Sequence, residues 1–225
     1  MRVAVIDSGV NAGHPHIHGI TGGAGIRDGG EIAPDYLDIL GHGTAVLAAI
    51  QEKAPEAEYF AVQLFQTSLS TSAELVSRAV DWAIDEGMDV INLSLGTCNP
   101  DHRLRFEALV ERSRGRGAVL VSARQAGDGA ALPGSLPGVI GAGLDWNCDR
   151  DFYRVETFAD GEVFYASGYP RPLPGLSPER NLHGISFAVA NLTGFVIRAY
   201  GRLLAEGGRP DVDSVRKALL AEVHI

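Results

Sequence analysis

The chain has 225 residues, of which 45% are hydrophobic and 21% are charged, and its formal net charge is −9. A chain of this length can bury one sizeable core, so we expect a single domain over residues 1–225. The acidic surface would repel phosphates, and no apolar run is long enough to span a membrane, so neither nucleic acid nor a membrane is an expected partner.

Predicted strands and helices alternate along the chain. A short buried strand over 3–6 is followed by a stretch from 11 to 41 whose Gly, His and Pro content predicts loop. The next predicted elements are a helix over 44–53, a strand over 59–64, a helix from a Thr71 or Ser72 cap to Ile84, a strand over 90–95, a helix over 104–114, and strands over 118–123 and 139–142.

The last third of the chain is less regular. Residues 146–183 are rich in proline and predict hairpins and loops, whereas 186–204 predicts a long apolar helix. Asp211 or Asp213 is the expected cap of a final helix. The alternation as a whole predicts the α/β class, with a doubly wound, mostly parallel sheet and helices on both faces.

Three polar residues lie at the ends of predicted elements. Asp7 follows the first strand, His42 begins a helix, and Ser186 begins another. A serine hydroxyl becomes a nucleophile when a base takes its proton, and that base needs a carboxylate to fix its tautomer. Because ligands bind at the carboxyl ends of parallel strands, we expect these three side chains to form one catalytic site.

The segments around these residues resemble the motifs of the subtilisin-like serine peptidases. The stretch 3–10 followed by His14-Pro15 is similar to the family's Asp motif, His42-Gly43-Thr44 to its His motif, and Gly184-Ile185-Ser186-Phe187-Ala188 to its Ser motif. The order Asp, His, Ser is that of the subtilisins. The resemblance implies the subtilisin-like three-layer fold and a triad of Asp7, His42 and Ser186.

Two further segments resemble substrate-binding parts of the family, so the resemblance spans nearly the whole chain. The stretch 90–96 is similar to the substrate-binding strand, which implies that Ser94, Leu95 and Gly96 pair with the substrate. The stretch 133–143 is similar to a wall of the specificity pocket and contributes Gly134. A peptide or protein substrate and no cofactor are implied.

The chain departs from the family at the expected oxyanion hole. Family members usually carry Gly-Asn after the strand that matches 118–123, whereas Gln125 is the best match here. Its amide is the same donor on a longer arm, so Gln125 and the backbone N–H of Ser186 are the expected donors. Loss of one such donor typically lowers kcat by about 10²–10³. The alternative is therefore a peptide-binding or scaffold protein of this fold with little or no activity.

Some side chains leave alternatives open. Two groups suit a metal in principle, although loop histidines and a solvated acidic loop are the commoner arrangements, so no metal site is predicted and calcium has no support. These groups are His14, His16 and His18, and Asp28, Glu31, Asp35 and Asp38. Cys98 and Cys148 fit either one disulfide or two reduced thiols.

The N-terminus bears on the compartment. Met1-Arg2 is followed by four apolar residues only, too few for the core of a signal peptide, so we expect a cytoplasmic protein. A broad peptidase would threaten its own cell there, which favours selective processing of one peptide or protein. The sequence indicates neither the cleavage-site preference nor the oligomeric state.

Overall fold

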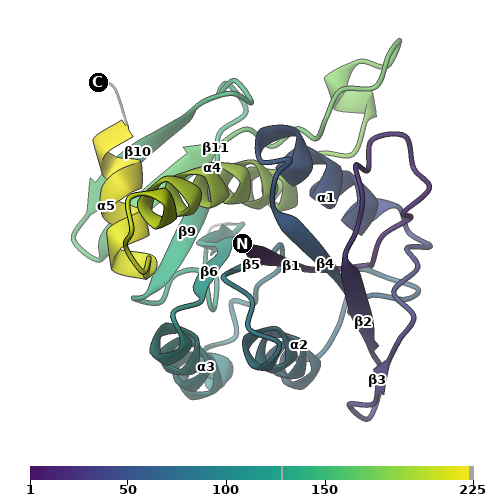
Figure 1. Ribbon diagram of the computed structural model, residues 1–225, viewed down its shortest axis with the longest axis horizontal. Helices are drawn as coiled ribbons and strands as arrows, with labels where there is room; N and C mark the ends of the chain where they lie inside the picture. Colours follow the sequence, from purple (N-terminus) through teal and green to yellow (C-terminus); the bar gives the residue numbers. More distant parts are fainter. Residues whose placement is uncertain (128, 223–225) are drawn as a thin grey trace.

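The computed structural model describes residues 1–127 and 129–222 (Figure 1). Within them lies a nine-stranded sheet with the order β10-β11-β9-β6-β5-β1-β4-β2-β3. All neighbouring strands are parallel except the two edge pairs, β2–β3 and β10–β11. The strands are β1 (Arg2–Asp7), β2 (Gly22–Ile26), β3 (Ile32–Ala33), β4 (Glu58–Gln63), β5 (Val90–Leu93), β6 (Val119–Ala123), β9 (Val139–Leu144), β10 (Tyr153–Phe158) and β11 (Gly161–Ala166).

Helices cover both faces of this sheet, as Figure 1 shows. One face carries α1 (His42–Lys53), α4 (Ile185–Ala205) and α5 (Val212–Glu222), and the other carries α2 (Ala73–Asp85) and α3 (Arg103–Arg116). Because strand side chains alternate, Val3 and Val5 enter the first core and Ala4 and Ile6 the second. The predicted doubly wound, three-layer α/β fold is confirmed.

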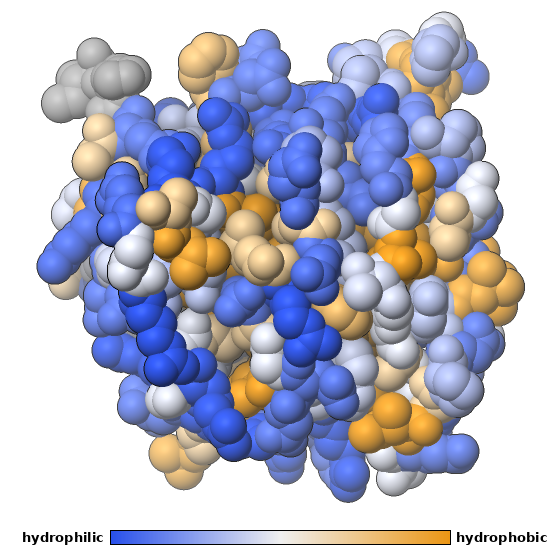
Figure 2. Space-filling view, in the orientation of Figure 1, coloured by the Kyte–Doolittle hydropathy of each residue, from blue (hydrophilic) through white to orange (hydrophobic). Residues whose placement is uncertain are grey.

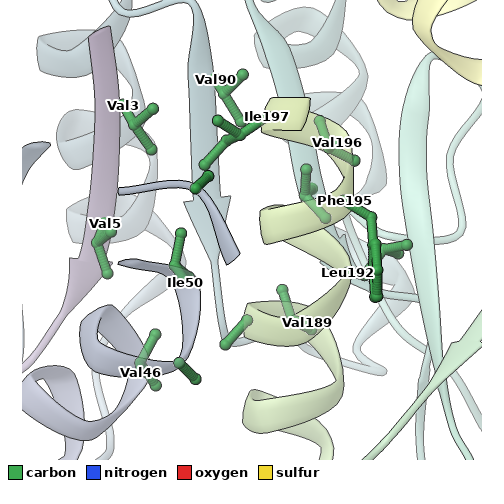
Figure 3. Close-up of a cluster of buried hydrophobic side chains, with 14 of the residues drawn as sticks. Val3, Val5, Val46, Ile50, Val90, Val189, Leu192, Phe195, Val196 and Ile197 are labelled. Atoms are coloured by element: carbon green, nitrogen blue, oxygen red, sulfur yellow. The ribbon is translucent and has the colours of Figure 1, made fainter. Parts of the chain in front are cut away.

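The core between the sheet and the first helix layer joins α1 to α4. Figure 3 shows Val46 and Ile50 of α1 beside the strand residues Val3 and Val5, with an apolar face of α4 next to them. The two helices approach closely at Gly194, where an added Cβ would lie 2.7 Å from the Cβ of Lys53. The N-termini of both helices therefore share one packed support.

Three features differ from the sequence prediction. β2 and β3 lie in the stretch predicted as loop, because Gly22 and Gly23 give β2 little strand propensity. Gly23 is needed there, since an added Cβ would lie 2.1 Å from the carbonyl oxygen of Ala61 on β4. A small separate sheet pairs β7 (Gln125–Ala126) with β8 (Gly129–Ala130), and α1 begins two residues earlier than predicted.

The helix caps follow the expected chemistry. The Ser72 hydroxyl accepts a hydrogen bond from the backbone N–H of Leu75 (3.2 Å) at the start of α2. Asp211, rather than Asp213, accepts from the N–H of Ser214 (2.8 Å) at the start of α5.

The face seen in Figure 2 is mostly hydrophilic, with apolar side chains in scattered groups. In the described part of the chain, no helix combines the length and apolar character needed to cross a membrane.

Two glycines in helices test how tightly α1 docks on the sheet. An added Cβ at Gly43 would lie 2.3 Å from the carbonyl oxygen of Gly9, whereas one at Gly115 in α3 meets no atom within 4 Å. We expect Gly43→Ala to lower the free energy of unfolding by about 1–3 kcal/mol. Gly115→Ala, the control, should leave it unchanged or raise it by up to about 1 kcal/mol. Urea denaturation of both variants measures this, and equal values would contradict the close approach.

Candidate active site

The predicted triad residues lie at the carboxyl edge of the sheet and at two helix N-termini. Asp7 is the last residue of β1, His42 the first of α1 and Ser186 the second of α4. The turn after Asp7 requires glycine, since Gly9 has φ +96° and an added Cβ would lie 2.2 Å from the carbonyl oxygen of Tyr36. No residue with a Cβ therefore fits two positions after Asp7 without a change in the backbone.

A buried hydrogen bond joins Asp7 and His42. Nδ1 of His42 lies 2.7 Å from Oδ1 of Asp7, and the same oxygen accepts from the backbone N–H of Ser8 (2.8 Å). Asp7 is fully buried and His42 is 9% exposed. With Nδ1 as the donor, Nε2 carries the lone pair of the neutral ring, which is the tautomer that a general base needs.

The surroundings of His42 favour its protonated form. Burial of the imidazole lowers its pKa, but the hydrogen bond to Asp7 and the negative charges of Asp7 and Asp38 act in the opposite direction. Together they outweigh burial, and the pKa of His42 lies above its ordinary value of 6.5.

Ser186 is linked to the end of β5 and, through its neighbour, to the histidine. Its hydroxyl donates to the carbonyl oxygen of Ser94 (3.1 Å). The ring of Phe187 lies 5.5 Å from that of His42, centroid to centroid. Among the described residues, no hydrogen bond joins the Ser186 hydroxyl to the imidazole of His42. Catalytic hydrogen bonds are often unformed without substrate.

The two expected oxyanion donors differ in their settings. The N–H of Ser186 is one of the first four amides of α4, which have no acceptor within the helix. Gln125 is exposed on β7, and its backbone pairs with Ala130 of β8. The structure joins Gln125 to no member of the triad within the residues that it describes, so its role stays a prediction.

The expected substrate-binding residues become more exposed along the chain. Ser94 is buried, Leu95 is half-buried and Gly96 is exposed. Gly134 is buried behind the end of β6, where an added Cβ would lie 1.9 Å from the carbonyl oxygen of Ala123. Close packing against the backbone of Ala123 explains why glycine is needed at position 134. That Gly134 helps to form the wall of the substrate pocket stays a prediction.

Sequence reasoning missed Asp38 as part of this site. It was grouped with possible calcium ligands, but its carboxylate instead accepts hydrogen bonds from Ser8 and from the beginning of α1. Asp38 lies three residues before Gly41, the N-cap of α1, so the usual capping pattern does not mark it in the sequence. Asn191 was also missed. It is buried, and its amide donates to the carbonyls of Ser167 (2.9 Å) and Tyr169 (3.0 Å).

The remaining open residues form no metal cluster. Across 1–127 and 129–222, no group of three His, Cys, Asp or Glu side chains is placed to hold a metal ion. The rings of His14 and His16 touch edge to face, with centroids 5.2 Å apart. Cys98 and Cys148 are free thiols rather than one disulfide.

Comparisons with known proteins identify a family and several similar proteases. A subtilase family model matches residues 1–143. Thermostable alkaline protease of Halalkalibacterium halodurans is 35% identical over 161 residues, which cover 66% of this chain and 43% of that protein. Subtilisin Savinase of Lederbergia lenta is 31% identical over 203 residues, or 86% of this chain and 70% of that protein. The chain thus spans less than half the length of the first relative.

A solved structure agrees in fold. Prenylagaramide maturation protease PagA superposes with a TM-score of 0.72 and 24% identity, over 100% of this chain and 83% of that one. The family match covers more than half of the chain, and the carboxyl-edge position of the Asp7–His42 pair is consistent with it. The chain therefore belongs to the subtilase family of serine peptidases.

Proposed function

We propose that this chain is a serine endopeptidase in which Ser186 is the nucleophile, His42 the general base and then acid, and Asp7 the carboxylate that orients His42. The observation that carries the proposal is the buried 2.7 Å hydrogen bond between Asp7 and Nδ1 of His42. It leaves Nε2 as the acceptor, beside the helix N-terminus that bears Ser186.

The reaction follows from these positions. Oγ of Ser186 attacks the carbonyl carbon of the peptide bond while its proton passes to Nε2 of His42. The N–H of Ser186 donates to the resulting oxyanion, and Gln125 is the proposed second donor. His42 then protonates the leaving amine as the C–N bond breaks, which forms an acyl-enzyme. Water, deprotonated by the same imidazole, hydrolyses the ester and restores Ser186.

We assign an extended substrate to two cavities, neither of which is lined by Asp7, His42 or Ser186. One of about 530 Å³ lies on the α2–α3 side, and its walls include Leu95 and Gly96. The other, of about 380 Å³, lies on the α1 side between Gly41 and Leu182. A peptide that pairs with 94–96 and presents its carbonyl to Ser186 would run from the first cavity toward the second.

We further propose that the natural reaction is selective processing of a peptide or protein. Two observations support this proposal: the similar structure PagA is a maturation protease, and two cavities offer room for substrate side chains. Cleavage of a random peptide library, with Ser186→Ala as the control, tests it. Preferred residues at several positions around the cleaved bond are expected, and cleavage without any preference would contradict selectivity.

A catalytically weak peptide-binding protein is the second candidate. The hydroxyl of Ser186 bonds to the carbonyl of Ser94 rather than facing the base, and Gln125 is exposed, which are the observations that favour it. A fluorophosphonate probe separates the candidates, because its phosphorus bonds to Oγ and releases fluoride only when the serine is activated.

The first expected outcome concerns the triad as a unit. The probe should label the parent and the Ser177→Ala control, which alters an exposed serine, but not Ser186→Ala. Ser186→Ala and His42→Ala should each lower kcat/KM by about 10⁴–10⁶, and the double variant should lose little more, as in subtilisin itself. Multiplying losses, or labelling of Ser186→Ala, would show that the assignment is wrong.

The pH dependence follows from the raised pKa of His42. His42 must be neutral to accept a proton, so kcat/KM should rise through one ionisation whose midpoint lies above about 6.5. Because folding raises the pKa of His42, the protonated imidazole stabilises the folded state at low pH. This contribution to the free energy of unfolding is lost as the pH rises through the pKa of His42 in the folded state. A profile measured between pH 5 and 9 that is flat, or has its midpoint below 6.5, would count against His42 as the base.

Gln125 is tested by truncation and by a shorter amide. If its amide reaches the oxyanion, Gln125→Ala should lower kcat by up to about 10²–10³ with little change in KM, because the bond forms mainly in the transition state. Gln125→Asn keeps the donor on a shorter arm. A higher kcat for Asn than for Ala would place residue 125 within reach. An unchanged kcat in Gln125→Ala would mean that another group is the second donor.

A further inference from the structure

The carboxylate of Asp38 collects five hydrogen bonds at the beginning of α1. Oδ1 accepts from the hydroxyl of Ser8 (2.8 Å) and from the N–H groups of Leu40 (3.0 Å) and Gly41 (2.8 Å). Oδ2 accepts from the N–H and the hydroxyl of Thr44, at 2.8 and 2.6 Å. Asp38 is only 9% exposed. So many donors around one carboxylate exceed what a helix cap requires, since a cap needs one bond.

Ser8 extends this arrangement to the catalytic aspartate. Its hydroxyl donates to Asp38 and accepts from the N–H of Gly43, 2.8 Å away, directly after His42. Its own N–H donates to the same oxygen of Asp7 that holds Nδ1 of His42. The Asp38 carboxylate therefore fixes the backbone on both sides of the Asp7–His42 pair, at the end of β1 and at the start of α1.

Asp38 also adds a charge near the imidazole. The elements packed around His42 present Asp7 from β1, Asp38 from the turn before α1, and the uncharged Phe187 and Ser186 from α4. Both carboxylates raise the pKa of His42, against the effect of burial. The protonated imidazole that forms during catalysis is thus stabilised by two negative charges instead of one.

We propose that Asp38 is a second carboxylate of the peptidase site, a positioning residue that acts through Ser8 and Gly43 to hold His42 on Asp7 and that stabilises the imidazolium. The inference rests on the proposed peptidase function. It differs from a purely structural cap in two measurable respects. It links Asp38 to kcat rather than KM, and to the ionisation of His42.

Asp38→Asn tests it, with Asp35→Asn as the matched control. Both remove one negative charge from the same loop, but the side chain of Asp35 is 71% exposed. In Asp38→Asn an NH₂ group, which donates, replaces one of the two carboxylate oxygens, both of which accept hydrogen bonds. The hydrogen bonds to that oxygen are therefore lost. We expect kcat to fall at least about tenfold, since small misplacements of catalytic groups are costly, with KM nearly unchanged. The pH at which kcat/KM reaches half of its plateau on the acid side should also fall. Values equal to those of Asp35→Asn would overturn the proposal.

A second measurement does not depend on turnover. NMR titration of the His42 ring in Ser186→Ala, with and without Asp38→Asn, should show a lower pKa when the carboxylate is removed. An unchanged His42 pKa would overturn the charge role even if the protein proved not to be a peptidase. Should Asp38→Asn fail to fold, Ser8→Ala decides the positioning role, because it removes the bridge to Gly43 and keeps the cap on Thr44. It should lower kcat with KM unchanged, and parent-like kcat would overturn that role.

Discussion

A buried contact between a carboxylate and an imidazole joins the end of β1 to the beginning of α1, and the rest of the site depends on it. Asp7 is fully buried, and His42 and the N–H of Ser8 both bond to its Oδ1, whereas Oδ2 has no hydrogen-bond partner among the residues that the structure describes. The parallel sheet makes this contact possible, because β1 lies between β4 and β5 and its last residue, Asp7, meets the first residue of α1, His42.

The parts of the fold that could be predicted are those where burial alone sets the pattern. The strands β1, β5 and β6 are apolar runs because both of their faces are covered, and α4 is apolar over most of its length for the same reason. β2 was not predicted because its close backbone contact with β4 requires glycine, and glycine in a sequence is typical of loops. The β7–β8 pair is too short to leave a periodic signal.

The same distinction applies to the site. Asp7, His42 and Ser186 could be predicted as a triad because each combines a reactive side chain with the end of an element, and their catalytic roles stay predictions. Asp38 was not, since a carboxylate in an acidic loop looks the same in sequence whether it faces solvent, a metal or five backbone and hydroxyl donors. Only the path of the chain shows which donors meet it. Gln125, Gly134, the single domain and the cytoplasmic location stay predictions.

The close approach of α1 and α4 at Gly194 affects how thermal motion reaches the site. Helices that touch at backbone distance and share one core move as one body, so a displacement of α1 carries α4 with it. His42 and Ser186 lie at the N-termini of these two helices. When the two helices move together, the distance between the two side chains changes less than the position of each side chain does. We therefore expect the separation of the His42 and Ser186 side chains to be less sensitive to temperature than the position of either side chain alone.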